Sequence, residues 1–357
     1  MPVLARYLGR SVIAFTVLTM TVLMILFGVY LFADEQSNIG EGSYTALDAL
    51  AFALLNLPTS IFDLLPLGAL IGALLGLANL ARGSELTVMR AAGVSTLRLA
   101  AWVGATGLLL AGIAWVIGDY IAPPLEQYAL QQKTFARFKE ISLIGDQSPW
   151  AKDGNTFVSA QRQTTDNQFG GVYVFQFDAD RHLLSVARAA SAEAGKQWVL
   201  HDYVESRLDA QPGGDRIVVT REATHQFPTS LSAEFLGLAA KSPESLPGRV
   251  LFEMIRHLRS NGLDTSSFEI ALWSRIARTV AVVFFVMLAV PFALGSTRSG
   301  SANVRIVIGV LVGVAFFLFA KTIESGAAVF NLPPLLVAWS PTLLLALVTV
   351  GAVARAR

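Results

Sequence analysis

The chain has 357 residues, of which 54% are hydrophobic and only 15% are charged, and its mean hydropathy is +0.55. This composition is too apolar for one soluble core and indicates an integral membrane protein. The absence of cysteine excludes disulfides, thiolate metal sites and cysteine nucleophiles, and a net charge of +1 gives no indication of nucleic-acid binding.

Three uncharged runs near the start of the chain are each long enough to cross a bilayer, at ~1.5 Å of rise per helical residue. The first, residues 11–33, is too long for the apolar part of a typical signal peptide, and no small-residue cleavage site follows it. We therefore predict a retained crossing there. The other two runs are residues 64–81 and 99–118. Between the first two crossings, residues 44–57 predict an interfacial helix that ends at Pro58.

The second run contains Gly68, Gly72 and Gly76, a repeated GxxxG spacing. Small residues at this spacing allow the backbone of another helix to approach closely. We expect these glycines to form a helix-packing face.

A polar segment, residues 82–98, lies between the second and third crossings. Within it, Leu86, Met89 and Val94 fall on roughly one face of a short amphipathic helix, and Gly93 is expected to end that helix. A short helix in the loop of a membrane protein is a suitable contact for a soluble partner. The alternative is an ordinary juxtamembrane turn whose arginines only set the topology.

Three more runs, residues 279–297, 306–320 and 335–354, predict the fourth to sixth crossings, so two groups of three helices flank a large insert. If the N-terminus is inside, the short outside loops contain only Lys321 among lysines and arginines, whereas the inside segments contain nine arginines. This bias predicts that both termini and residues 82–98 are cytoplasmic and that the insert, residues 119–278, is outside the cytosol. The nine arginines are Arg6, Arg10, Arg82, Arg90, Arg98, Arg298, Arg305, Arg355 and Arg357.

The insert begins and ends with helical patterns and has strand patterns between them. Residues 126–141 are expected to extend the third crossing into solvent, and residues 249–260 form a helix that leads to the fourth. Asp153-Gly154 predicts a hairpin turn within the first strand pair. Strands at this spacing predict a small sandwich or an open roll, and an open roll leaves an edge that can pair with another protein. The predicted strand regions are residues 150–159, 172–177, 182–192, 197–208 and 216–227.

The sequence lacks the common motifs for bond chemistry. The sequence contains no GxxxxGK[ST], HExxH or GxSxG string, so we predict no catalytic residue, no metal site and no ATP binding by this chain. Asp119 and Glu126 have no evident acid–base partner nearby in the sequence. The four histidines all lie in the insert and are expected to be strand or surface residues: His182, His201, His225 and His257.

Charged residues at the outer ends of the crossings are the candidates for lipid binding. Lys321 and Glu324 are three residues apart, share one helix face and could pair with each other. Lys321 either extends its charge to the interface or binds an anionic lipid head group. Lys133, Arg137 and Lys139 form a second cationic strip after the third crossing. The predicted substrate-binding set is Phe27, Tyr30, Lys133, Arg137, Phe317, Lys321 and Glu324.

The layout of the whole chain resembles the YjgP/YjgQ (LptF/LptG) family of lipopolysaccharide-export permeases. The resemblance spans almost the full length, and the strings near residues 42–44 and 150–155 favour the LptG type over the sister LptF type. The matching strings are Gly42-Ser43-Tyr44, Ala46-Leu47, Leu74-Leu75-Gly76-Leu77, SELTVM at residues 84–89, WAKDGN at residues 150–155 and Pro333-Pro334.

The resemblance implies an α-helical membrane protein with six transmembrane helices (3+3) and an inserted periplasmic all-β, jelly-roll-like domain. Residues 1–122 would hold helices 1–3 with the coupling helix 82–98, residues 123–267 the β-domain with its flanking helices, and residues 268–357 helices 4–6. The protein would lie in the bacterial inner membrane. Glu85 would seat in a groove of the ATPase, flanked by Arg82, Leu86, Met89 and Arg90.

The implied partners are a homologous LptF-type permease in a heterodimer, two LptB-type ATPase subunits, and periplasmic β-roll proteins of the LptC and then the LptA type. ATP and Mg²⁺ would bind to the ATPase, and this chain would bind no cofactor. The substrate would be lipopolysaccharide, which the complex would extract from the inner membrane for export to the outer membrane.

One feature departs from the family pattern. Lysines that bind substrate phosphates are expected just after the first crossing, but residues 31–38 contain Asp34 and Glu35 and no lysine. Lys133, Lys321, the partner permease or a divalent ion would have to supply the positive charge. The alternative functions are a passive scaffold that displays the β-domain and an intramembrane enzyme, for which the sequence offers no catalytic set.

Overall fold

The computed structural model describes residues 2–138, 141–142, 150–165, 168–178, 180, 182–193, 198–211, 214–228, 242–294, 302–330 and 332–355. Lys139, Arg298 and Arg357, which the sequence analysis used, lie outside these residues. Within them, six helical segments are long and apolar enough to cross a bilayer, which confirms the predicted number. They are Val3–Asn38, Ala46–Arg82, Thr96–Arg137, Ser266–Leu294, Val307–Gly326 and Pro334–Arg355.

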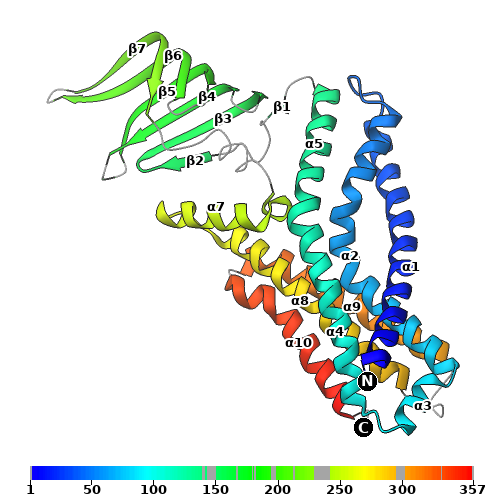
Figure 1. Cartoon of the computed structure of the whole chain (residues 1–357). Helices are drawn as coiled ribbons and strands as arrows, with labels where there is room; N and C mark the ends of the chain where they lie inside the picture. The colour runs from blue at the N-terminus through cyan, green and yellow to red at the C-terminus, as the bar shows by residue number, and fades with distance from the viewer. Residues whose placement is uncertain are drawn as a thin grey trace.

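The helices form one bundle with α2 at its centre, and the sheet lies beyond one end of that bundle, over α7 (Figure 1). Both termini and α3 lie at the opposite end (Figure 1). The third crossing is one continuous rod, in which α4 passes through a π-helical turn, η2 (Ile117–Ile121), into α5. The helices are α1 (Pro2–Glu35), α2 (Ala46–Arg82), α3 (Glu85–Ala91), α4 (Thr96–Val116), α5 (Ala122–Phe138), α7 (Gly248–Ser260), α8 (Ser266–Leu294), α9 (Ala302–Phe330) and α10 (Pro334–Arg355).

The prediction that a helix ends at Pro58 is wrong, because α2 begins after a capping box of Thr45 with Asp48 and continues through Pro58 and Pro66. Proline removes the backbone donor to the carbonyl four residues earlier, here those of Leu54 and Phe62, but helices in membranes tolerate it. Around Pro58, side-chain bonds to other carbonyls accompany the helix: the Ser60 hydroxyl donates to the Asn56 carbonyl at 3.1 Å, and the Asn56 amide donates to the carbonyl of Phe52 at 2.8 Å. The outer loop and the second crossing are therefore joined in one helix.

The three glycines of α2 lie against α1. A Cβ at Gly68 would approach Met20 Sδ to 2.2 Å, and a Cβ at Gly72 would approach Thr16 Cα to 2.4 Å. At Gly76 the nearest atom would be Ser11 O, at 3.1 Å. The close approach of a second helix that the GxxxG spacing predicts is present, and α1 is the helix concerned.

The prediction for the start of the fourth crossing also needs correction. The uncharged run begins at residue 279, whereas α8 begins at Ser266. Arg275 and Arg278 are therefore residues of the long apolar helix itself and not of the segment before it. They are tolerated there because acidic groups of neighbouring helices compensate their charges.

The described strands form one antiparallel sheet in which β3 to β7 each pair with the next strand along the chain. This order agrees with an open roll, and the described strands contain no second sheet of a sandwich. Its core includes Phe169 and Trp198, whose rings stack with centroids 5.5 Å apart. The strands are β1 (Ile141–Ser142), β2 (Trp150–Asp153), β3 (Thr156–Thr165), β4 (Gln168–Phe177), β5 (Leu183–Glu193), β6 (Trp198–Gln211) and β7 (Gly214–Phe227).

The predicted hairpin between β2 and β3 is present, but its turn lies one residue further along the chain. Asp153 pairs with Thr156, so the two central residues are Gly154 and Asn155. Gly154 has φ +60°, a conformation that glycine adopts without steric cost.

Candidate functional site

The first candidate feature is α3, a helix of seven residues between α2 and α4. Gly93, with φ +87°, follows it, as the sequence predicted. Leu86, Met89 and Val94 are only 3–6% exposed and belong to the main core of the bundle. Their burial fixes the orientation of α3 on the helices that cross the membrane. A force applied to α3 would therefore be transmitted to the bundle.

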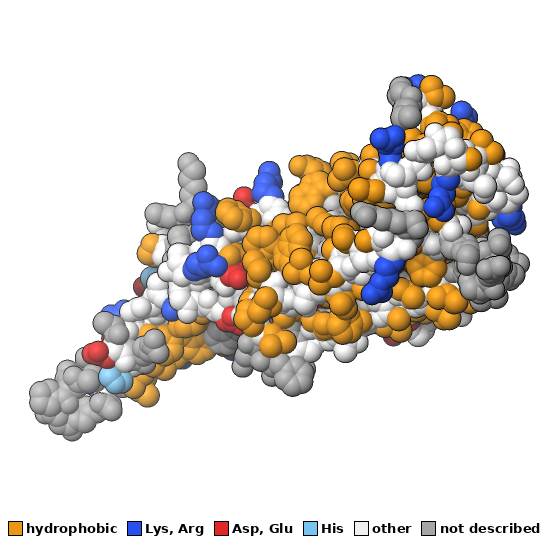
Figure 2. Space-filling model, turned by 90° about the horizontal axis from the view of Figure 1, so that it is seen from below, with side chains coloured by type: hydrophobic (Ala, Val, Ile, Leu, Met, Phe, Trp, Pro, Cys, Tyr) orange, Lys and Arg blue, Asp and Glu red, His pale blue; other side chains and the backbone are white. Residues whose placement is uncertain are grey.

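This packing changes the role of two predicted contact residues. Leu86 and Met89 point inward, because their apolar side chains gain more from the core than from solvent, and neither side chain is free to flank a partner groove. The side chains of Arg82, Val88 and Arg90 are exposed instead. Figure 2, which views the molecule from below Figure 1, shows basic side chains among broad apolar surfaces of the bundle.

Glu85 begins α3 and is partly exposed. Its carboxylate interacts with the Tyr7 hydroxyl of α1, and within the described part of the chain it forms no ion pair. An acidic side chain in the first turn also suits the positive end of the helix dipole. Glu85 is therefore held in place on the side of the bundle where the arginines lie.

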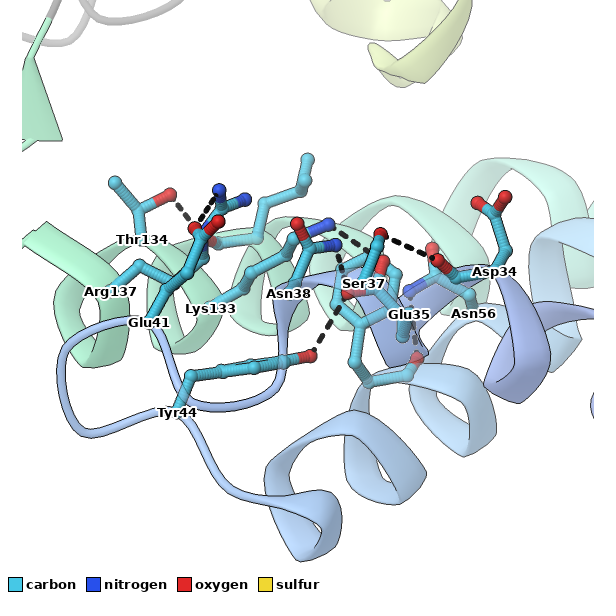
Figure 3. A network of polar contacts seen from close by, with 12 residues as sticks. Asp34, Glu35, Ser37, Asn38, Glu41, Tyr44, Asn56, Lys133, Thr134 and Arg137 are labelled. Carbon is cyan, nitrogen blue, oxygen red and sulfur yellow. Dashed lines mark hydrogen bonds and ion pairs between the residues drawn. The ribbon is translucent and has the colours of Figure 1, made fainter.

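The second feature is a network that ties the α1–α2 connection to α5 (Figure 3). Glu35, only 3% exposed, accepts from Lys133 Nζ at 2.6 Å, from the Asn38 amide at 3.0 Å and from the Tyr44 hydroxyl at 3.2 Å. The Lys133 ammonium also lies 4.6 Å from the centre of the Phe52 ring. Burial, and then the neighbouring Glu35 carboxylate, raise the pKa of Tyr44, so the phenol stays protonated and donates.

The next turn of α5 repeats this arrangement. Arg137 Nε donates to Glu41 Oε2 at 2.7 Å, and its guanidinium also pairs with Glu41 through Nη2. Ser43 donates to the Ala136 carbonyl through both its backbone NH, at 2.7 Å, and its hydroxyl, at 2.9 Å. Lys133 and Arg137, two of the three cations predicted to bind substrate, are thus already paired with carboxylates of the same chain.

The third feature is a group of ion pairs between α2, α8 and α9. Arg278 of α8 contacts Asp63 at 2.5 Å and Glu324 at 3.3 Å. Lys321 lies 3.6 Å from Glu244. The pair of Lys321 with Glu324 that the sequence allowed is not formed: Glu324 pairs with Arg278 of the neighbouring helix, and Lys321 lies near Glu244.

Arg275 links these ion pairs to the residues that precede α7. Its guanidinium, in a residue 7% exposed, contacts Asp119 at 3.2 Å and donates to the carbonyls of Gly118 at 3.0 Å and Glu244 at 3.1 Å. Asp119 in turn accepts from the backbone NH of Gly248, at 2.6 Å. One arginine therefore joins α8 to the π-helical turn and to η3 (Pro243–Ser245), the short helix that precedes α7.

The predicted substrate-binding residues fall in two separate places. Phe27 and Tyr30, with ring centroids 5.5 Å apart on α1, and Lys133 and Arg137 belong to the side of the bundle that α1 and α5 form. Phe317, Lys321 and Glu324 line a narrow cavity between α2, α8, α9 and α10.

The sequence did not indicate that Glu35 and Glu41 pair with cations of α5, and it gave no role to Arg275 and Arg278, which precede the uncharged run of the fourth crossing. A single acidic residue inside an apolar run, Asp63, was the available signal for a buried cation.

The described residues contain one cluster with a spacing suited to a metal ion: Asp178, Asp180 and His182, at the turn between β4 and β5. Asp178 accepts from both the backbone NH and the ring of His182, at 2.8 and 3.2 Å. These contacts account for the spacing as a hydrogen-bonded turn.

Comparisons with known proteins agree with these features. The family described as "Lipopolysaccharide export system permease LptF/LptG" matches residues 6–355. The lipopolysaccharide export system permease protein LptG of Escherichia coli (strain K12) is 33% identical over 95% of this chain and 94% of its own length. The LptG protein of Haemophilus influenzae is 32% identical over 96% of this chain and 95% of its own length.

Proposed function

The chain belongs to the LptF/LptG family of lipopolysaccharide export permeases, and we propose that it is the LptG-type half of an ATP-driven extractor of lipopolysaccharide. In this proposal it lies in the bacterial inner membrane with both termini and α3 in the cytoplasm and the sheet in the periplasm. The positive-inside bias supports this orientation, as do the termini, which lie with α3 at the end opposite the sheet (Figure 1).

The anchored helix α3 is the observation that carries the proposal. A transporter subunit without a nucleotide site needs a rigid element through which a separate ATPase moves it. Leu86 and Met89 fix α3 to the bundle, and Glu85, Arg82 and Arg90 present charges to a soluble partner. We assign the contact with an LptB-type ATPase, which holds ATP and Mg²⁺, to these three charged residues.

The lipid path uses the faces that the bundle leaves uncovered. α1 and α9 both pack on α2, and each exposes a row of large apolar side chains. An LptF-type permease facing these helices would enclose a cavity lined by α1, α2 and α9. Removal of an acyl chain from a bilayer costs about 0.8 kcal/mol per CH₂, so a lipid with several chains needs both external work and a continuous apolar path.

The carboxylate network suggests a way in which this chain could bind phosphates without lysines after the first crossing. Lys133 and Arg137 are the cations to which we assign phosphate binding, and at rest they pair with Glu35 and Glu41. A phosphorylated head group gains these cations only by displacing a carboxylate, so we propose an exchange of anions at the top of α5. Lys321, about half exposed, lies apart from these two cations, beside the cavity between α2, α8, α9 and α10.

The sheet would receive the lipid and pass it to periplasmic β-roll partners of the LptC and then the LptA type. Among the described strands β7 pairs only with β6, and its side chains from Arg216 to Thr224 are exposed on both faces. A free strand edge of this kind offers backbone groups for pairing with another strand.

Replacement of Glu85 tests the assignment. We expect Glu85→Lys to abolish co-purification of the ATPase with the permease and to stop ATP-driven release of lipopolysaccharide from proteoliposomes. Glu253→Gln, an exposed charge change on α7, is the control and should leave both unchanged. Full ATPase association and transport by Glu85→Lys would overturn the coupling role of α3.

A further inference from the structure

A two-part cavity lies between α2, α8, α9 and α10, at the end of the bundle nearest the sheet. Its outer chamber, of about 710 Å³, also touches α5 and the connection that contains η3. Its inner slot, of about 60 Å³, runs between the helices. Both parts share a collar of five residues: Asp63, Ser274, Arg278, Lys321 and Glu324. No residue of α1 lines either part, so the cavity is distinct from the α1–α2–α9 face proposed for the lipid path.

The two parts differ in chemistry. The inner slot is apolar beyond the collar, with Phe285, Phe316 and Phe317 among its lining residues. The outer chamber carries hydroxyl groups and charges, including Ser242, Ser266 and Ser267. An apolar slot joined through a polar collar to a polar chamber suits an amphiphile and not a fully polar solute.

The charge of the outer chamber selects the head group. Five acidic side chains line it, against three basic ones: Asp63, Glu126, Glu244, Asp264 and Glu324, against Arg275, Arg278 and Lys321. All three bases already pair with acidic groups. The Glu126 carboxylate is in no described ion pair, and the one contact described for it is a hydrogen bond of 3.0 Å from the Thr59 hydroxyl. The excess negative charge favours a ligand with a cationic donor and disfavours an anion.

Ser274 in the collar supplies an independent sign of a ligand. The residue is only 5% exposed, and its hydroxyl oxygen has no hydrogen-bond partner among the described residues. Buried hydroxyl groups are normally paired, because a buried unpaired one loses its bonds to water without replacement. This hydroxyl lies between the polar chamber and the apolar slot, where the ester or phosphate oxygens of a lipid would stand.

We propose that this cavity binds a membrane lipid whose head group carries an ammonium with N–H donors. The ammonium lies in the outer chamber against Glu126, an ester or phosphate oxygen accepts from Ser274, and the start of an acyl chain enters the slot beside Phe317. The bound lipid fills the space between α8 and α9 on the side of α2 away from α1. This proposal does not depend on the lipopolysaccharide role.

The test measures lipid binding to the purified complex by native mass spectrometry, with dioleoyl phosphatidylethanolamine, phosphatidylcholine and phosphatidylglycerol as probes. Phosphatidylethanolamine is expected to bind most tightly, since phosphatidylcholine lacks N–H donors and phosphatidylglycerol lacks the cation. Glu126→Gln should weaken phosphatidylethanolamine binding about tenfold, the size of one charged hydrogen bond, and leave phosphatidylglycerol unchanged. Glu253→Gln on α7 is the matched control.

A second variant, Ser274→Val, fills the collar without a change of charge and should reduce binding of phosphatidylethanolamine and phosphatidylcholine alike. Equal affinity of the unaltered complex for all three lipids would overturn the proposal. So would unchanged phosphatidylethanolamine binding in both cavity variants. A failure of lipopolysaccharide release with these affinities intact would instead count against the proposed function alone.

Discussion

Single charged residues determine how the outer ends of these helices are held together. Glu35 is nearly buried, and it is stable as a carboxylate because Lys133, Asn38 and Tyr44 all donate to it. Lys133 therefore has two roles in this account, as the counterion of Glu35 at rest and as a phosphate ligand during transport. The sequence suggested only the second role, because nothing in spacing alone shows that residues 98 positions apart meet.

Loss of that counterion should be costly. In Lys133→Met, Glu35 keeps its buried charge without a partner, and we expect the complex to lose about 3 kcal/mol of stability. The measurement is the thermal unfolding midpoint in detergent. In the double variant Glu35→Gln/Lys133→Met the unpaired charge is absent, so most of the loss should be recovered. A double variant as unstable as the sum of the two single variants would contradict this explanation.

A buried tyrosine gives the sheet a dependence on alkaline pH. Burial, and then the nearby Glu205 and Glu222, raise the pKa of Tyr203 to about 12. In the unfolded chain the phenol ionises near pH 10, so the unfolded state loses its proton first. The contribution of Tyr203 is full below about pH 10 and is lost as the pH rises towards 12. Tyr203→Phe should unfold with a smaller alkaline dependence by circular dichroism, and an unchanged dependence would argue against this assignment.

At the level of elements, α2 organises the bundle through close backbone contacts. Its glycines allow α1 to pack with Thr16 almost against its backbone. The sequence predicted this face, because the GxxxG spacing is local. It did not predict the partner helix or the continuation through Pro58, because both depend on how α2 packs against helices that are distant in the sequence. The start of α8 was misplaced for a similar reason, since the charges of Arg275 and Arg278 are compensated only in three dimensions.

Addition of one methyl group to this contact should force the two helices apart. A Cβ at Gly72 would lie 2.4 Å from Thr16 Cα, a backbone atom that cannot move alone. We expect Gly72→Ala to lower stability by about 1–3 kcal/mol, as overpacking does. Gly112→Ala is the matched control, since beyond the adjoining backbone of its own helix no described atom lies within 4 Å of its Cβ position. Equal unfolding midpoints for the two variants would show that α1 and α2 are not in close contact.

On the scale of the whole molecule, the order of helices and sheet could be predicted from hydropathy, charge bias and turn residues, because these signals are local and repeated. The site could be predicted only in part. The role of Glu85 came from the family resemblance and that of Lys133 from its place after the third crossing, and both remain predictions. The ion pairs and the chamber collar arise from residues brought together by folding. The division of the predicted substrate-binding residues between two places also arises from folding, so the sequence alone could not show it.

The account depends most on which side of the membrane α3 occupies, and labelling with a membrane-impermeant maleimide measures this directly. The chain has no cysteine, so Val88→Cys on α3 and Ile217→Cys on β7, both 65% exposed in the unaltered chain, can be probed one at a time. The account predicts that in spheroplasts Ile217→Cys is labelled at once and Val88→Cys only after the membrane is permeabilised. Labelling of Val88→Cys in intact spheroplasts would place α3 away from any cytoplasmic ATPase and contradict the proposed transmission of force.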